Sequence, residues 1–224
     1  MNKSIVHYAS ITKKITMSII GLFLAVFLVV HLSLNLLLLL KDGGVTFSEA
    51  AEFMGTNIFI QIFEKVLFLA FIIHIILGIF LWWVNLKARP IKYVKTNVSK
   101  TTAGSKWMIH TGVIVFIFLI LHFMNFYFVK IGLVPVPAGA ADNHDFYTMT
   151  TMLFGNMWYS IIYIIAFITL GIHLNHAVQS GFQSLGLEHS KYTPFIKGLS
   201  TVYAIIIAVG FSIIPIYFLI NPVG

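Results

Sequence analysis

Long apolar runs, separated by short polar segments, make up most of this chain. Five of the runs are free of charged residues over most of their length. A bilayer core about 30 Å thick requires roughly 20 helical residues. The pattern therefore predicts five transmembrane helices, at approximately 15–40, 62–86, 107–130, 154–179 and 198–220. The first run is too long for the apolar core of a signal peptide, so we expect it to be a retained helix.

The composition agrees with this pattern. Only 9% of the residues are charged and 59% are hydrophobic, whereas about 25% of residues are charged in soluble domains. We therefore expect an all-α integral membrane protein whose residues 1–224 form a single transmembrane domain. Segment 42–64 is expected to be a loop with a short amphipathic helix, and 132–146 a second loop.

The charged residues predict the direction of the spans. With five spans, eleven of the 14 basic residues fall on the side of the N-terminus, whereas six of the seven acidic residues fall on the other side. The positive-inside rule makes the N-terminus cytoplasmic and the C-terminus external. The basic segment 87–100 either only sets this topology or also docks a cytoplasmic partner or anionic lipid headgroups.

Histidines stand inside the predicted spans. Each of the first four helices carries one among large apolar residues, namely His31, His74, His122 and His173. A single such imidazole is most simply a neutral group that hydrogen-bonds to a neighbouring helix. One in each of four helices favours two sites in which two facing imidazoles ligate one haem iron. The chain has no cysteine, so iron–sulfur ligation and covalent c-type haem are excluded.

The depth of the histidines suggests how they pair. His31 follows Lys14 by 17 residues and His122 follows Lys106 by 16, which places both roughly 25 Å from the cytoplasmic flank. His173 lies nearer the cytoplasm. The depth of His74 is ambiguous, and a pair with His173 is possible if the second helix begins near residue 57.

Further residues give weaker signals. Gly21 and Gly112 each precede a span histidine by ten residues. They either leave room for the face of the second macrocycle or allow close helix packing. His110 and His176 lie near the cytoplasmic edge. They are either residues that contact a ligand or a haem propionate, or ordinary interfacial polar residues.

The order and spacing of four segments resemble a known family. The segments are FLVVHLSLNL, FIIHIILG, TGVIVFIFLILHF and IHLNHAVQSGFQSLGL, which carry the four span histidines. Together they are similar to the five-helix dihaem cytochrome b subunit of bacterial succinate dehydrogenase/fumarate reductase (succinate:quinone oxidoreductase). The resemblance covers nearly the whole chain and implies a four-helix haem-binding bundle with a fifth, peripheral helix.

The resemblance implies cofactors and partners. His31 and His122 would be axial ligands of a distal haem b, and His74 and His173 those of a proximal haem b. A flavoprotein with FAD and an iron–sulfur protein would bind the cytoplasmic face. Electrons would pass between these subunits and a membrane quinone such as menaquinone, in the bacterial cytoplasmic membrane. Succinate or fumarate would bind another subunit, so this chain would be part of an enzyme without a dicarboxylate site.

Two positions relate to quinone and proton chemistry. Some family members have an acidic residue at the quinone site near the distal haem, and here Glu52 or Glu49 is the candidate. Some also have a glutamate two residues before the fourth-helix ligand, which is proposed to conduct protons. Gly171 occupies that position here, which argues against a proton path by that route.

Two other functions are compatible with the sequence. The histidines could relay protons in a transporter or channel, although no inverted repeat or pair of broken helices is visible. The chain could also be a haem-free anchor for peripheral subunits. An absorption spectrum of the purified chain separates these hypotheses from the dihaem cytochrome.

Overall fold

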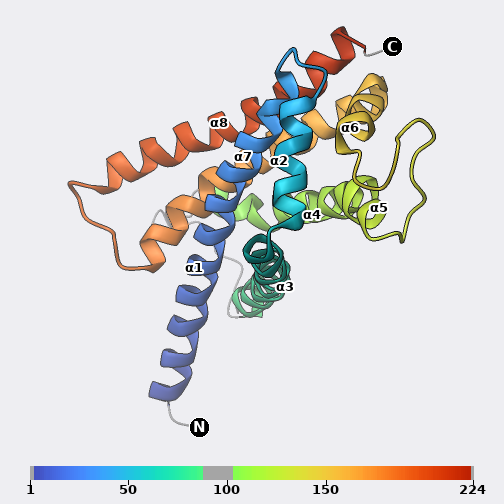
Figure 1. The fold of residues 1–224 in the computed structure, drawn as a ribbon. Coiled ribbons are helices and arrows are strands. Elements are labelled where there is room, and N and C mark those ends of the chain that lie inside the picture. Colours follow the sequence, from blue (N-terminus) through green and yellow to red (C-terminus); the bar gives the residue numbers. More distant parts are fainter. Residues whose placement is uncertain (1–2, 88–102, 223–224) are drawn as a thin grey trace.

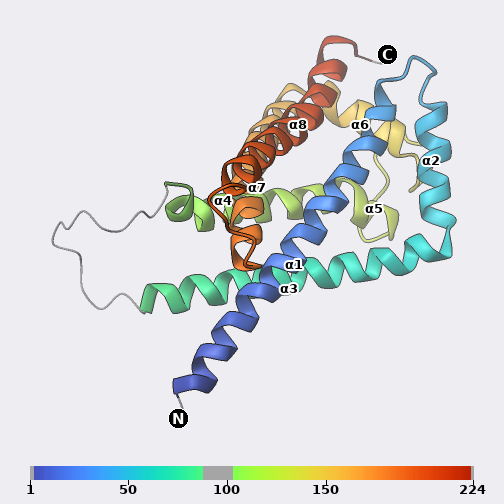
Figure 2. The same ribbon diagram turned by 90° about the vertical axis from the view of Figure 1, so that its left-hand side faces the viewer.

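The computed structural model describes residues 3–87 and 103–222 of the chain, and its regular structure is helical throughout those ranges. Figures 1 and 2 show the arrangement. The helices are α1 (Lys3–Leu36), η1 (Leu37–Leu39), α2 (Val45–Thr56), α3 (Ile58–Lys87), α4 (Ala103–His122), η2 (Phe123–Tyr127), α5 (Phe128–Lys130), α6 (Phe146–Gly155), α7 (Met157–Ser184) and α8 (Thr193–Ile220).

The five predicted spans are present. Within the described ranges, five helical segments are long and apolar enough to cross a membrane, namely Ile11–Leu39, Ile58–Lys87, Trp107–Lys130, Met157–Ser184 and Thr193–Ile220. The chain is thus an all-α, multi-pass membrane protein. The N-terminus lies at one end of the bundle, which we call the N-terminal side. At the opposite end, the C-terminal side, the C-terminus lies with α2 and α6 (Figure 1).

The segment between the first two spans contains the predicted short helix, α2. The Asp42 side chain stabilises the start of α2, because its carboxylate accepts hydrogen bonds from the backbone N–H groups of Gly44 and Thr46. Gly44 itself has φ +85°, a left-handed conformation that glycine adopts at little cost. After α2, the Asn57 side chain accepts a bond from the N–H of Phe59 and so starts α3.

The fourth span begins later than predicted because a short helix precedes it. The helix α6 ends at Gly155. The Asn156 side chain then accepts hydrogen bonds from the N–H groups of Trp158 and Tyr159 at the start of α7. Asp145 caps α6 in the same way, through the N–H of Thr148. The apolar stretch that begins at Phe146 therefore forms two helices, of which only α7 is long enough to span.

The fifth span, α8, forms much of the core. Its buried residues include Ile207, Phe211 and Phe218, which pack against α7 and α1. The Tyr203 hydroxyl also donates a 2.7 Å hydrogen bond to the Ala25 carbonyl of α1. Although α8 carries no histidine, it packs against α1 and α7, two of the four helices that carry them (Figure 2). The fifth helix is therefore part of the core, whereas the resemblance implies a peripheral helix.

The contact between α7 and α8 is closest at Gly171. A Cβ at this position would lie 2.8 Å from the Ala208 Cβ and 3.2 Å from the Ala204 carbonyl oxygen. These distances are too short for a side chain, so the glycine permits close helix packing. This packing gives a physical reason for the absence of an acidic residue here.

Candidate cofactor site between four helices

Two of the span histidines face each other near the C-terminal side. His31 of α1 and His122 of α4 have ring centroids 5.9 Å apart and ring planes at 81°. His31 lies eight residues before Leu39 and His122 eight before Lys130, the ends of their spans. At 1.5 Å per residue both are about 12 Å from those ends.

The other two histidines also face each other, deeper in the bundle. His74 of α3 and His173 of α7 have ring centroids 6.5 Å apart. Because α3 begins at Ile58, His74 lies 16 residues from the start of its helix. His173 lies 16 residues after Met157, so both are about 24 Å from the C-terminal side. The four histidines thus form two layers, and the ambiguity over the depth of His74 is resolved.

The spacing within each pair fits one metal ion between two imidazoles. Nitrogen ligands about 2.0 Å from an ion on opposite sides place the ring centres roughly 6.3 Å apart. The observed distances of 5.9 and 6.5 Å are close to this value. In addition, the Nδ1 atoms of His74 and His122 are buried and have no hydrogen-bond partner. A buried ring nitrogen without a partner costs free energy unless a ligand satisfies it.

The donor set favours a macrocycle over a bare ion. Among residues 3–87 and 103–222, no group of three or more His, Cys, Asp or Glu side chains is placed to hold a metal ion. Each pair thus offers two protein ligands, and a bare ion would require more. A haem carries its own equatorial nitrogens and takes only axial ligands from the protein. The residues present therefore fit a bis-imidazole haem.

In each pair, one imidazole is oriented by a neighbour. The Thr111 hydroxyl lies 3.2 Å from His173 Nδ1, and the Asn35 amide nitrogen lies 3.4 Å from His31 Nδ1. Such contacts orient the ring and set which nitrogen is free to bind a metal. Asn35 stands on α1 with His31, and Thr111 stands on α4 with His122.

Gly21 and Gly112 lie beside the second pair. A Cβ added at Gly21 would lie 3.5 Å from His74 Cε1, and one at Gly112 the same distance from His173 Cε1. The two glycines therefore belong to the layer of the second pair, although they stand on the helices of the first. At both positions the helix backbone thus lies close to the edge of an imidazole.

Aromatic side chains enclose the first pair. Phe27 stacks on His31 at 5.3 Å, and Phe211 of α8 lies 5.7 Å from the same ring. Phe126 lies 5.2 Å from His122. Tyr163 of α7, which is 1% exposed, lies 6.4 Å from His122.

A cavity lies on the C-terminal side, close to the first pair in sequence. Its volume is about 290 Å³, and it is lined by η2, α6, the start of α7 and the loop that follows α5. Asn125, Asn156 and Tyr159 provide its polar groups. Asn125 also donates a 2.8 Å hydrogen bond to the Tyr163 hydroxyl, which connects the cavity wall with the surroundings of His122.

The remaining candidate residues lie apart from the two pairs. Glu49 and Glu52 are exposed on α2 and do not line this cavity. His110 is exposed and packs on Trp107 at 5.1 Å. His176 is half-buried, one turn beyond His173. Most of the basic segment 87–100 lies outside the described residues.

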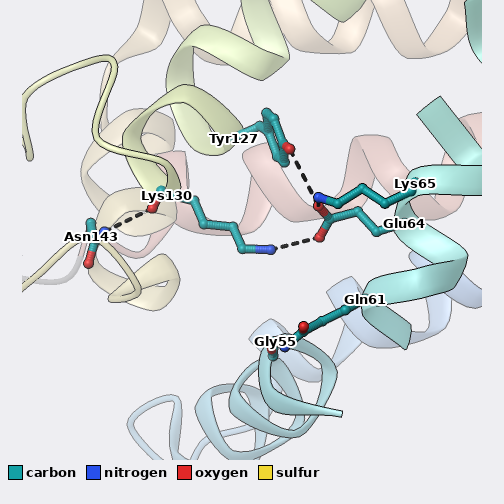
Figure 3. Close-up of polar contacts among 7 residues, drawn as sticks. All are labelled: Gly55, Gln61, Glu64, Lys65, Tyr127, Lys130 and Asn143. Carbon is teal, nitrogen blue, oxygen red and sulfur yellow. Dashed lines mark hydrogen bonds and ion pairs between the residues drawn. The ribbon is translucent and has the colours of Figure 1, made fainter. Parts of the chain in front are cut away.

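One polar cluster, around Glu64, was not predicted from the sequence (Figure 3). The Glu64 carboxylate forms an ion pair with Lys130 at 2.8 Å, across two spans. An acidic residue next to a lysine at the start of an apolar run was a usable signal, because unpaired charges at that depth are costly. The partner could not be identified from the sequence, because the pair joins residues 66 positions apart.

Comparisons with known proteins identify no family: no family model, curated protein or solved structure matches this chain. The chain is established as a five-helix, strongly apolar membrane protein with two layered histidine pairs.

Proposed function

We propose that this chain is the membrane-anchor cytochrome b subunit of a succinate dehydrogenase or fumarate reductase. The observation that carries the proposal is the pair of layered sites, in which two imidazoles face each other at the spacing of a bis-imidazole metal site. The motif resemblance supports the same function from the sequence.

Each of the four histidines would hold a haem through one imidazole nitrogen. His31 and His122 would bind a distal haem b, and His74 and His173 a proximal one. When bound, the two irons supply one-electron chemistry across the membrane. The protein holds the rings in place through Thr111 and the aromatic contacts, and it excludes water by surrounding the imidazoles with apolar helices.

The two sides of the bundle would meet different partners. The N-terminal side would be cytoplasmic and bind an iron–sulfur subunit, with a flavoprotein bound in turn. Lys87, Lys191 and Lys197 lie at helix ends on this side and would attract acidic surface on the partner. The dicarboxylate would react on the flavoprotein, away from this chain.

A quinone headgroup would bind in the cavity on the C-terminal side. Asn125, Asn156 and Tyr159 provide hydrogen-bonding groups in an otherwise apolar wall of Met, Pro and Val side chains. This combination suits a ligand with an apolar ring and carbonyl oxygens. Asn125 is three residues from His122, so the cavity is adjacent to the first pair. We therefore prefer this cavity to Glu49 and Glu52.

An optical spectrum of the purified chain tests the proposal. Reduced b-type haem bands at about two haems per chain, one for each histidine pair, are expected. A proton channel would instead be colourless and would conduct protons in vesicles. A haem-free anchor would be colourless, would not conduct, and would still bind the peripheral subunits. A colourless chain, isolated with its subunits from cells that make haem, would contradict the proposal.

A further inference from the structure

The four helices that carry the histidines are not packed equally closely. α1 packs against α3 and α7, and α4 packs against α7, whereas α3 and α4 touch only sparsely. Within α3, all of whose residues are described, Ala70 alone is buried. Figure 2 shows α3 apart from α4 over much of its length. Among the helices of the described residues, the flank between α3 and α4 is therefore open.

This flank is closed at the C-terminal side by a small cluster. Glu64 of α3 accepts a 2.8 Å hydrogen bond from the Lys130 ammonium group and a 3.4 Å bond from the Tyr127 hydroxyl. Next to it, Phe68 of α3 packs against Tyr127 and Phe123, with ring centroids 4.6 and 5.3 Å away. Figure 3 shows the two charged side chains reaching across between the helices.

The Glu64–Lys130 pair is more sheltered than an ordinary surface ion pair. Its side chains are 23% and 24% exposed, whereas Lys65, which also contacts Glu64, is 71% exposed. Partial burial strengthens the attraction between charges. It also makes the loss of one partner costly, because the remaining charge is partly buried and loses its sheltered partner.

The cluster is linked to both histidine pairs along the chain. Glu64 stands on α3, which carries His74. Lys130 ends the segment that starts at His122 and passes through the π-helical turn η2, where the Phe128 N–H bonds to the Phe123 carbonyl. Such a turn interrupts the regular α-helical spacing. Tyr127 at its end and Lys130 just after it both point toward α3 (Figure 3).

We infer that Glu64 and Lys130 are positioning residues, which form a clasp that closes the flank between α3 and α4. The clasp joins the helix of one ligand of each pair, so it holds both pairs at their ring spacing. The flank would be the side on which a bound planar ligand is least covered by the protein. The part of this inference that concerns haem rests on the proposed function, whereas the helix closure does not.

Glu64→Gln, Lys130→Gln and the double variant test the clasp, with Lys65→Gln as the matched control. The first readout does not depend on haem. Because the chain has no cysteine, Phe59→Cys and Ile131→Cys give a clean pair of spin-label sites at exposed positions. In either single variant the distance distribution between the labels should broaden and lengthen. In Lys65→Gln it should stay as in the parent.

The second readout is the rate at which haem passes to an excess of apomyoglobin. We expect each single variant to lose haem about tenfold faster. Replacing Glu64 leaves the sheltered Lys130 without its partner, and replacing Lys130 leaves Glu64 with only the exposed Lys65. The double variant should lose haem more slowly than either single variant, since neither sheltered position then carries a charge and the remaining Lys65 is exposed to solvent. Lys65→Gln should stay within about twofold of the parent, as expected of an exposed pair.

The outcomes separate the clasp from the proposed function. Single variants that match Lys65→Gln in label distance would overturn the clasp, whatever the haem content. Broadened distances in a chain that holds no haem would leave the clasp standing and contradict the proposed function. If a single variant fails to fold, the double variant is compared with Lys65→Gln. The distance between the labels should then lengthen in the double variant and not in Lys65→Gln.

Discussion

The two histidine pairs differ in what surrounds them. Around His31 and His122 the neighbours are aromatic rings, including Phe211 from α8. Among the described residues, the ring contacts of His74 and His173 are with each other only, and their close neighbours include two glycines and a threonine. The pair His31–His122 is enclosed by large side chains. The pair His74–His173 instead lies close to the backbone of neighbouring helices.

This difference follows from the way the helices are shared. α1 and α4 carry the ligands of the first pair, and one layer deeper they supply Gly21 and Gly112 to the second. Because these two residues have no side chain, α1 and α4 pass close to the imidazoles of the second pair at these positions. The first pair should therefore tolerate the trimming of a neighbouring side chain, whereas the second should not tolerate the addition of one.

The largest effect is expected from removal of a ligand. His31→Ala or His122→Ala should remove roughly half of the haem and leave the bands of the second pair, because the layers use separate ligands. Haem content per chain and the reduced spectrum measure this. Retention of both haems would refute the assignment of the first pair, and loss of both would show that the layers are not independent.

Filling the glycine space should come next. Gly112→Leu should prevent haem binding at the second pair and preserve the first, because its side chain would occupy the space beside His173. The matched control is Gly198→Leu, at a helical glycine with no atom within 4 Å of the added Cβ. Equal haem content in the two variants would remove the distinction between the pairs.

A smaller effect is expected at the wall of the first pair. Tyr163→Phe deletes the hydroxyl that accepts a hydrogen bond from Asn125. The loss should cost about 1 kcal/mol, which lowers the midpoint of thermal unfolding by about 3 °C in a chain of this size. Haem content should be unchanged. Tyr159→Phe, at an exposed tyrosine, serves as the control and should shift the midpoint less.

The smallest effect should come from Thr111→Val. This change removes the hydroxyl next to His173 Nδ1 and keeps the shape of the side chain. An imidazole without this partner is a less basic ligand, so the reduction potential of the second pair should rise. A redox titration followed by optical spectroscopy would show one of two components shifted. A shift of the other component would reverse the assignment of the layers.

Much of the fold could be predicted because lipid imposes a simple rule on the sequence. Each span needs a long apolar run, and each run is visible by itself. Helix breaks within a run are harder to predict. The cap at Asn156 divides one apolar stretch into α6 and α7, and the local cue was only a Gly-Asn pair. The π-helical turn after His122 has no sequence pattern that we could use.

The histidine positions were predictable, whereas their surroundings were not. Depth along a helix follows from counting residues, so the level of His31 with His122 could be estimated. Which helices are neighbours depends on packing between distant segments. The open flank, the Glu64–Lys130 contact and the approach of α8 to His31 therefore required the structure. The cavity residues come from four segments, which no local pattern connects.

The tight contact at Gly171 has a consequence for how this protein could change over time. A carboxylate side chain at that site would collide with the Ala208 methyl group and crowd the Ala204 carbonyl oxygen of α8. A lineage that acquired proton conduction there would first need a mutation that moves α8 outward, with no benefit of its own. This glycine should therefore persist as long as the two helices stay in contact.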